Sequence, residues 1–168
     1  MTTATEPDPV AGFRAELVSW LAEHLTGAVI EAGRAGMDVE GNFEVLRQWN
    51  QTLADAGWAA VAWPREFGGR EAGIAEQLAW LEEMSAAEAP GAINVIGVSN
   101  IAPAIMAVGT EEQRARFLAP ILRGVESGSQ GRAEPDAGSD LASLRTSARL
   151  EGDVFVVNGQ KTWNSLGR

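Results

Sequence analysis

Residues 109–133 read GTEEQRARFLAPILRGVESGSQGRA, and the character of the chain changes within this stretch. Thr110 and Gln113, three positions apart, form the capping-box pattern that begins a helix, and Gly124 is typical of the position just after a helix ends. Beyond Gly124, glycine, serine and short alternating runs replace the apolar residues spaced by three and four. The sequence therefore predicts a helical part up to residue 124 and a β-sheet part from residue 125.

Four further helices are predicted upstream, over residues 13–30, 42–57, 74–88 and 95–108. Asn42 is expected to cap the second of them. The fourth is apolar nearly all round, which predicts a buried helix with Pro103 in its first turns or at a kink. The third is expected to bury one face, made by Ile74, Leu78, Leu81 and Met84.

Four strands are predicted after the helices, over residues 127–133, 144–150, 154–159 and 160–165. Glu151–Gly152–Asp153 is expected to close one hairpin, and Asn158–Gly159 is the strongest two-residue hairpin signal in the chain. The predicted fold class is α+β, an N-terminal helical bundle followed by an incomplete antiparallel β-domain. The expected division is a disordered tail at 1–12, a helical domain at 13–124 and a β-domain at 125–168.

The composition excludes several kinds of site and partner. None of the 168 residues is cysteine and only His24 is histidine, which excludes thiolate chemistry and disulfides and predicts no metal site. A net charge of -10 makes nucleic acid an unexpected ligand. No apolar run is long enough to span a membrane, and the acidic first twelve residues do not resemble a signal peptide. The sequence therefore predicts a cytoplasmic protein.

Residues 133–144, AEPDAGSDLASL, contain the first candidate site. This stretch predicts a tight turn whose backbone N–H groups, with the Ser139 hydroxyl, hold an anionic or carbonyl-bearing ligand. The alternative is that Gly138, Ser139 and Asp140 only shape a loop between strands.

Trp163 and Ser165 are the second candidate site. Residues two apart in a strand face the same side, so an indole and a hydroxyl are expected to line one wall together. A flat redox ring suits that arrangement, because it stacks on the indole and accepts a hydrogen bond at its edge. The alternative is that Trp163 covers the core of the sheet.

Three blocks, in this order and spacing, resemble the acyl-CoA dehydrogenase family. They are residues 109–124, then EPDAGSDLASLRTSA at 134–148, then GDVFVVNGQKTW at 152–163. The upstream stretches WPREFGG (63–69) and LAWLEEMSAA (78–87) are similar to the helical domain of that family. The resemblance covers the chain from about residue 13. It implies the N-terminal helical domain and the first part of the β-domain, without the C-terminal helical bundle.

The resemblance implies that FAD is the cofactor. Ser139 is similar to the family's serine that contacts both the flavin and the acyl-CoA chain, and Trp163 to the tryptophan that packs on the ring. The positions that the resemblance assigns to the flavin are Gln130, Arg132, Ala133, Ser139, Trp163, Asn164 and Ser165. Three positions depart from the family pattern. Ala133 lacks the usual hydroxyl, Arg132 replaces an apolar side chain, and Gly128 replaces an aromatic one.

The reaction of the family removes two hydrogens across the α–β bond of an acyl-CoA thioester, by proton abstraction at one carbon and hydride transfer from the other. The family's base lies in the C-terminal bundle, so no catalytic residue is predicted here, and Glu134 is expected only to shape the turn before Pro135. The expected partners are an acyl-CoA substrate and, once the missing half is supplied, a homo- or hetero-oligomer. The isolated chain is predicted to be inactive. The alternative is a helical interaction module or partner subunit that keeps the fold without the flavin.

Overall fold

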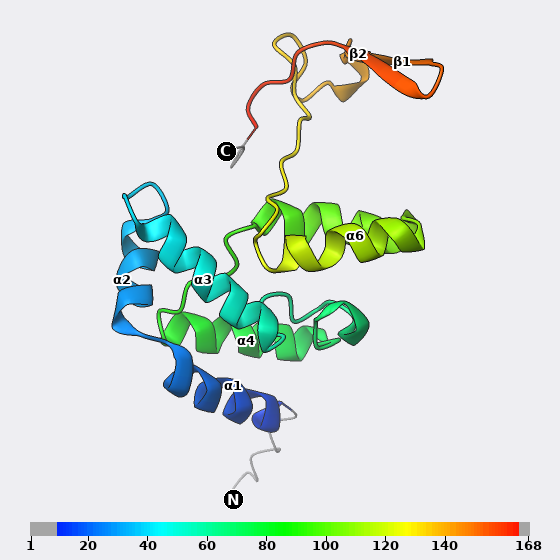
Figure 1. Ribbon diagram of the computed structural model, residues 1–168. Helices are drawn as coiled ribbons and strands as arrows, with labels where there is room; N and C mark the ends of the chain where they lie inside the picture. Colours follow the sequence, from blue (N-terminus) through cyan, green and yellow to red (C-terminus); the bar gives the residue numbers. More distant parts are fainter. Residues whose placement is uncertain (1–9, 165–168) are drawn as a thin grey trace, which may run out of the picture. The chain divides into compact units, whose positions relative to one another are not determined.

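The computed structural model describes residues 10–164. The chain divides into two units, Met1–Ser127 and Gly128–Arg168, shown in Figure 1. The first unit is helical, and the second contains a two-stranded antiparallel sheet. The predicted fold class, helices followed by antiparallel strands, is confirmed.

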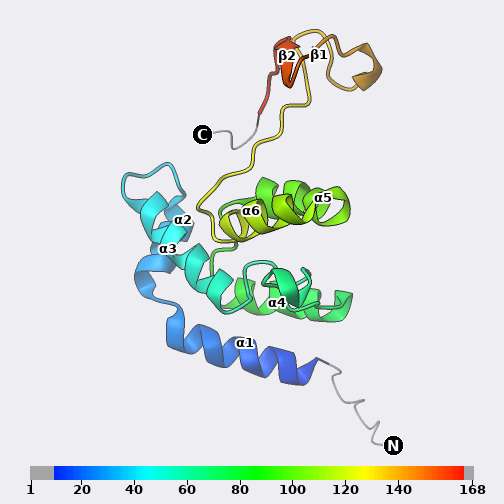
Figure 2. The same cartoon turned by 45° about the vertical axis from the view of Figure 1, so that its right-hand side comes forward.

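The helical unit is built from pairs of packed helices. Helix α1 packs against α4, α2 against α3, and α5 against α6, as Figure 2 shows from a second side. The α-helices are α1 (Ala11–His24), α2 (Gly27–Ala35), α3 (Asn42–Asp55), α4 (Ile74–Ala86), α5 (Ala102–Val108) and α6 (Glu111–Leu122). A 3₁₀ turn, η1 (Arg65–Phe67), precedes α4, and a π-helical turn, η2 (Gly97–Ile101), leads directly into α5.

The predicted single helix over residues 13–30 is wrong, because the chain bends between α1 and α2. Leu25 is extended, and Thr26 caps α2 with a hydroxyl that accepts a hydrogen bond from the Val29 N–H at 3.4 Å. The apolar spacing continues across the bend, since Leu25 and Val29 both pack against the core. Periodicity therefore did not reveal the break, which the capping residue Thr26 marks.

Two smaller boundaries also differ from expectation. Ala11 and Gly12 belong to α1, so the predicted tail extends too far, and residues 1–9 lie outside the described part of the chain. Asn42 is not the cap of α3 but its first residue, after Gly41 with a φ of 83°. Its side-chain amide instead donates to the Gly36 carbonyl at 3.1 Å.

The core of the helical unit surrounds Trp58. This side chain is fully buried, meets the Phe13 ring edge-on at 5.2 Å, and lies 3.3 Å beneath the Arg70 guanidinium carbon. Residues 57–73, which connect α3 to α4, contribute to this core. Gly68, with a φ of 91°, approaches α6 so closely that a Cβ there would lie 2.6 Å from the Leu122 side chain.

The predicted buried face of α4 is wrong, although Met84 is buried as expected. The buried residues of α4 are Ala79 and Met84. On α4, the carboxylates of Glu82 and Glu83 form ion pairs with Arg14 of α1 at 2.5 and 2.9 Å. These ion pairs join α4 to α1, against which it packs. The side chains left exposed are Ile74, Leu78 and Leu81.

The apolar stretch 95–108 is helical, but the prediction that it is buried holds only in part. Val98 and Ala102 are buried, whereas Val95 is 50% exposed and Val108 is 86% exposed. Pro103 lies in the first turn of α5, directly after the π-helical turn, which agrees with its expected place at an irregularity. Val95 and Val98 line a cavity, whereas Val108 does not.

The second unit contains one hairpin. Strand β1 (Ser147–Glu151) pairs antiparallel with β2 (Val154–Asn158), and the register places Glu151 opposite Val154. Gly152, with a φ of 62°, begins the two-residue loop. The predicted hairpin at residues 151–153 is therefore confirmed.

The other two predicted strands, over 127–133 and 160–165, are wrong as far as the structure describes them. Residues 128–133 and 160–164 are irregular, and Asn158–Gly159 starts no second hairpin within the described residues. Among the residues that the structure describes, the two irregular segments are joined by the backbone hydrogen bond from the Thr162 N–H to the Ala133 carbonyl at 2.9 Å. One isolated hydrogen bond does not make a ladder.

Two buried asparagines hold the end of α6. The Asn50 amide donates to the Leu122 carbonyl at 3.0 Å, and its oxygen accepts from the Ile93 N–H at 3.2 Å. The Asn94 amide donates to the Ile121 carbonyl at 3.0 Å and to the Glu126 carbonyl at 2.8 Å. Helix ends leave carbonyls without partners inside the helix, and these amides supply them in the interior.

We predict that Asn50→Ala strongly destabilises the helical unit. It leaves the buried Leu122 carbonyl and the part-buried Ile93 N–H without partners, at a cost of about 3 kcal/mol for the two groups. Urea unfolding of the 168-residue chain, followed by the helical circular dichroism signal, measures this loss. Asn42→Ala is the control, because its amide makes one hydrogen bond at a half-buried site and is expected to cost about 1 kcal/mol or less. Equal losses for the two variants would contradict the role of Asn50.

Candidate functional site

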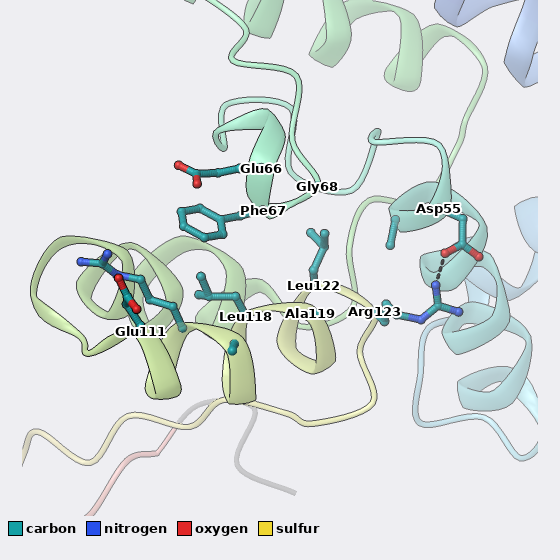
Figure 3. Close-up of a pocket in the computed structure, with 12 residues that line it drawn as sticks. Asp55, Glu66, Phe67, Gly68, Glu111, Leu118, Ala119, Leu122 and Arg123 are labelled. Atoms are coloured by element: carbon teal, nitrogen blue, oxygen red, sulfur yellow. Dashed lines mark hydrogen bonds and ion pairs between the residues drawn. The ribbon is translucent and has the colours of Figure 1, made fainter.

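Two of the cavities in the helical unit are similar in size and larger than a third, of about 410 Å³, between α1 and α4. The first, of about 590 Å³, lies between the end of α3, the turn η1 and helix α6; we call it the charged cavity. Figure 3 shows the Asp55–Arg123 ion pair at one end and the Glu66 and Glu111 carboxylates at the other. With Arg114, five charged residues line this cavity.

The second cavity, of about 580 Å³, lies between residues 59–63, helix α4 and residues 91–103; we call it the apolar cavity. Most of its wall is alanine and other small or branched apolar residues. Trp63 and Trp80 contribute indoles, and Ser99 contributes the only hydroxyl among the described residues of the wall. The Trp63 indole N–H is already used, since it donates to the Val98 carbonyl at 3.2 Å.

The apolar cavity is the better site for an apolar ligand. An apolar group placed in the charged cavity would remove water from charged side chains, which costs free energy unless new partners replace the water. Small-molecule sites are typically apolar concavities of 300–1,000 Å³ with few polar groups. The apolar cavity has both properties, and it lies entirely within one unit of the chain.

The second unit brings together two of the segments that the sequence singled out. Thr162 bonds to the Ala133 carbonyl, and the Lys161 ammonium donates to the Arg132 carbonyl at 3.1 Å. A Cβ at Gly131 would lie 3.1 Å from the Lys161 side chain, so glycine allows this close approach. Residues 131–133 and 161–162 therefore lie side by side although neither segment is a strand.

The predicted site residues in these segments are mostly exposed. Gln130, Arg132 and Asn164 are exposed or half-exposed side chains at the surface of the second unit. Trp163 is 89% exposed and has a φ of 57°, so it is not a strand residue and does not cover a sheet core. Ser165 lies outside the described residues, and the expected shared face with Trp163 is therefore not observed.

Ser139 lies in the tight turn that the sequence predicts. Glu134 and Ala137 exchange backbone hydrogen bonds of 2.8 and 3.1 Å across this turn, and Ser139 follows them on the surface. The Ser139 side chain is exposed. The structure does not distinguish a turn that binds a ligand from a loop that only joins strands. The assignment of Ser139 to flavin and acyl-CoA stays a prediction.

Glu134 is the most strongly tied carboxylate of the second unit. It accepts hydrogen bonds from the N–H groups of Arg145 at 2.7 Å and Thr146 at 2.9 Å, and from the Lys161 ammonium at 3.0 Å. The Arg145 N–H, then Thr146 and Lys161, lower the pKa of Glu134 from 4.5 to about 2. The sequence predicted that this residue shapes the turn, but the ties to residues 145, 146 and 161 were not foreseen.

The His24 side chain packs on its own helix, α1. Its ring stacks on Trp20 at 4.7 Å, and its Nδ1 lies 2.9 Å from the Trp20 carbonyl, to which it donates. Within residues 10–164, no three or more His, Cys, Asp and Glu side chains gather as a metal site would require. The helices of this part of the chain are also too short or too polar to cross a membrane.

Sequence reasoning missed the apolar cavity. Trp63, Trp80 and Ser99 come from three separate segments, and nothing in their spacing shows that they line one space. The sequence signal that could have revealed the cavity is the apolar character of residues 95–108 on all sides, which predicts burial. In the structure part of that surface lines the cavity instead.

The comparisons with known proteins agree with one another. The family model described as "Acyl-CoA dehydrogenase, N-terminal domain" matches residues 13–125. The acyl-CoA dehydrogenase IpdE1 of Mycobacterium tuberculosis is 45% identical over 160 residues, which are 94% of this chain and 41% of that protein.

Solved structures show the same relationship. The ChsE4–ChsE5 complex from Mycobacterium tuberculosis matches with a TM-score of 0.73 and 38% identity, over 99% of this chain and 41% of that one. The Tcur3481–Tcur3483 steroid ACAD matches with a TM-score of 0.70 and 36% identity, over 94% and 40%. The chain thus spans about two-fifths of the length of these relatives.

We predict that protonation of Glu134 loosens the second unit at low pH. Because its pKa is lowered in the folded state, the stability that it contributes is present above about pH 4.5 and is lost as the pH falls towards 2. The amide NMR signals of Arg145 and Thr146 in the 168-residue chain should titrate with a midpoint near 2. In Glu134→Gln this titration should be absent. The same titration in that variant would show that another acid causes it.

Proposed function

Because this chain belongs to the acyl-CoA dehydrogenase family, we propose that it forms the acyl-binding wall and one edge of the flavin site of an enzyme that desaturates acyl-CoA thioesters. The observation that carries the proposal is the apolar cavity, within the unit matched by the family model. An acyl chain is an apolar ligand, and burying it in this cavity provides binding energy at about 25 cal/mol per Å² of apolar surface. We propose the apolar cavity as the acyl site.

The size of the cavity favours a bulky acyl group. About 580 Å³ exceeds what a short linear chain fills, and the indoles of Trp63 and Trp80 give flat surfaces on which a ring packs. One matched structure is titled a steroid ACAD. We therefore propose a ring-containing acyl-CoA as the substrate class.

The residues of the second unit fit one edge of a flavin. The exposed indole of Trp163 offers a stacking surface, and its positive φ is the kind of backbone strain that clusters at functional sites. Residues 131–133 lie beside 161–162, so Arg132 and Ala133 are near the segment that bears Trp163. Bound FAD supplies the hydride acceptor. The roles of Gln130, Ser139, Asn164 and Ser165 follow the family resemblance alone.

No acid of this chain is proposed as the base that takes the α-proton. Glu134 is held as a carboxylate by three hydrogen-bond donors, two of them backbone N–H groups. A base with a pKa of about 2 is poorly matched to proton abstraction near neutral pH. We propose that the base comes from the C-terminal helical bundle of the family, outside these 168 residues.

A second candidate function is that of an interaction subunit without flavin. Ala133, Arg132 and Gly128 favour it, because each replaces a side chain expected against the ring. The ChsE4–ChsE5 match is titled a complex, and a heteromeric partner for this chain is part of the same proposal. Loss of flavin binding in the experiment below would support this second function over the first.

We predict that a chimera of this chain with the remaining residues of IpdE1 binds FAD and oxidises acyl-CoA with an artificial electron acceptor. Trp163→Ala should weaken flavin binding roughly ten- to hundredfold, by loss of a stacking surface. Ala133→Ser should strengthen it about fivefold, by one hydrogen bond. Flavin fluorescence titration measures both. His24→Ala is the control, since its ring stacks on Trp20 in the helical unit. Unchanged affinity in Trp163→Ala would remove this residue from the site.

We predict that Val95→Phe weakens acyl binding by narrowing the apolar cavity. Val95 lines the cavity and is half exposed, so the larger ring is accommodated without disturbing the buried core. Affinity for the N-acetylcysteamine thioester of 3-cyclohexylpropanoic acid should fall about tenfold or more. NMR titration of the 168-residue chain measures it. Val108→Phe, at an 86% exposed position of the same helical stretch outside the cavity, should bind like the parent. Equal binding by both variants would place the acyl group elsewhere.

A further inference from the structure

Among the described residues that line the apolar cavity, only Ser99 has a hydroxyl that can bond to a ligand oxygen. The Trp63 N–H is already bonded to the Val98 carbonyl. The Trp80 N–H has no partner among the described residues, but it is buried and is not exposed to the cavity. The remaining described side chains of the wall are apolar. Any polar recognition by side chains in this cavity therefore falls to Ser99.

The Ser99 hydroxyl makes no hydrogen bond within the described residues, and its side chain is exposed. A helical serine commonly donates back to the carbonyl four residues earlier. Ser99 does not, and its neighbourhood is a π-helical turn in which the Ala102 N–H bonds to the Gly97 carbonyl, five residues back. Turns of this kind occur often at functional sites.

The π-helical turn is fixed by Asn94. The Asn94 side-chain oxygen accepts from the Gly97 N–H at 3.3 Å, while its amide donates to two carbonyls at the end of α6. Gly97 allows this, since a Cβ there would lie 2.4 Å from the Asn94 amide nitrogen. Asn94 is 5% exposed, so the bonds that fix the turn bearing Ser99 are buried. The backbone that bears Ser99 is therefore held in place before any ligand binds.

We infer that Ser99 is a specificity-determining residue that selects acyl groups carrying an oxygen substituent, a keto or hydroxyl group, on the part remote from the thioester. This inference rests on the proposed acyl site. A wholly apolar acyl group removes water from the Ser99 hydroxyl and returns no partner. An acyl group with an oxygen at that point accepts the hydroxyl hydrogen instead. One net hydrogen bond corresponds to about a fivefold difference in affinity.

The experiment compares two ligands that differ only in that oxygen. They are the N-acetylcysteamine thioesters of 3-cyclohexylpropanoic acid and 3-(4-oxocyclohexyl)propanoic acid. The ¹⁵N-labelled 168-residue chain is titrated with each, and the indole N–H signals of Trp63 and Trp80, assigned with Trp63→Phe and Trp80→Phe, report occupancy of the cavity. These signals measure weak binding without requiring flavin or turnover.

The parent chain should bind the oxo thioester about fivefold more tightly than the cyclohexyl thioester. Ser99→Ala should bring the two affinities together by weakening only the oxo ligand. Ser85→Ala is the matched control, because Ser85 is an exposed helical serine outside the cavity, and it should keep the parent's preference.

The outcomes separate the two levels of the proposal. If both thioesters bind equally to the parent, or if Ser99→Ala keeps the preference, Ser99 is not a selector, and the acyl site itself stands. If neither thioester moves the Trp63 and Trp80 signals, the assignment of the cavity to the acyl group is wrong, and the role of Ser99 falls with it.

Discussion

The packing of the helical unit depends on the hydrogen bonds that satisfy the last carbonyls of helix α6. Its last carbonyls face the interior, where water is not available, so each needs a protein donor. The Pro120 carbonyl accepts from the backbone N–H groups of Val125 and Glu126, and the Ile121 carbonyl accepts from Gly124. The side-chain amides of Asn50 and Asn94 complete the set. Two buried side chains from elements distant in sequence thus decide where α6 ends and what it packs against.

The charged cavity and the apolar cavity each have a wall that depends on this constraint. Helix α6 forms one wall of the charged cavity, and residues 91–103, which Asn94 ties to α6, form one wall of the apolar cavity. Asn94 also fixes the π-helical turn at Gly97. The interaction that ends one helix therefore shapes the surface on which another segment presents Ser99. A buried amide is well suited to this, because an unpaired polar group in the interior is costly and so allows few alternative arrangements.

Some local signals predicted the structure correctly, although Asn158–Gly159 starts no hairpin within the described residues. Choices made by tertiary packing could not be predicted. The capping box at Thr110 and the hairpin loop at Gly152 are stretches of a few residues whose chemistry specifies their geometry, and both were predicted correctly. The orientation of α4 depends instead on Arg14, some seventy residues away, which pairs with Glu82 and Glu83. Asn50 is polar and lies in an amphipathic helix, so its complete burial has no signature in the periodicity. The motif around Ser139 and Trp163 identified a family. The strands that the sequence predicted at this motif are not formed in the residues that the structure describes.

Each of the two units is stabilised by a different kind of interaction within itself. The helical unit has a core of aromatic and aliphatic side chains around Trp58, whereas every residue of β1 is exposed and only Val156 of β2 is half-buried. An isolated two-stranded hairpin is marginally stable in water, so burial contributes little to the second unit. Its ordering instead relies on the Glu134 carboxylate, which connects the turn to residues 145, 146 and 161 through charge-assisted hydrogen bonds. The proposed acyl site thus lies in the part with its own core, and the proposed flavin edge lies in the part held mainly by one ionised group.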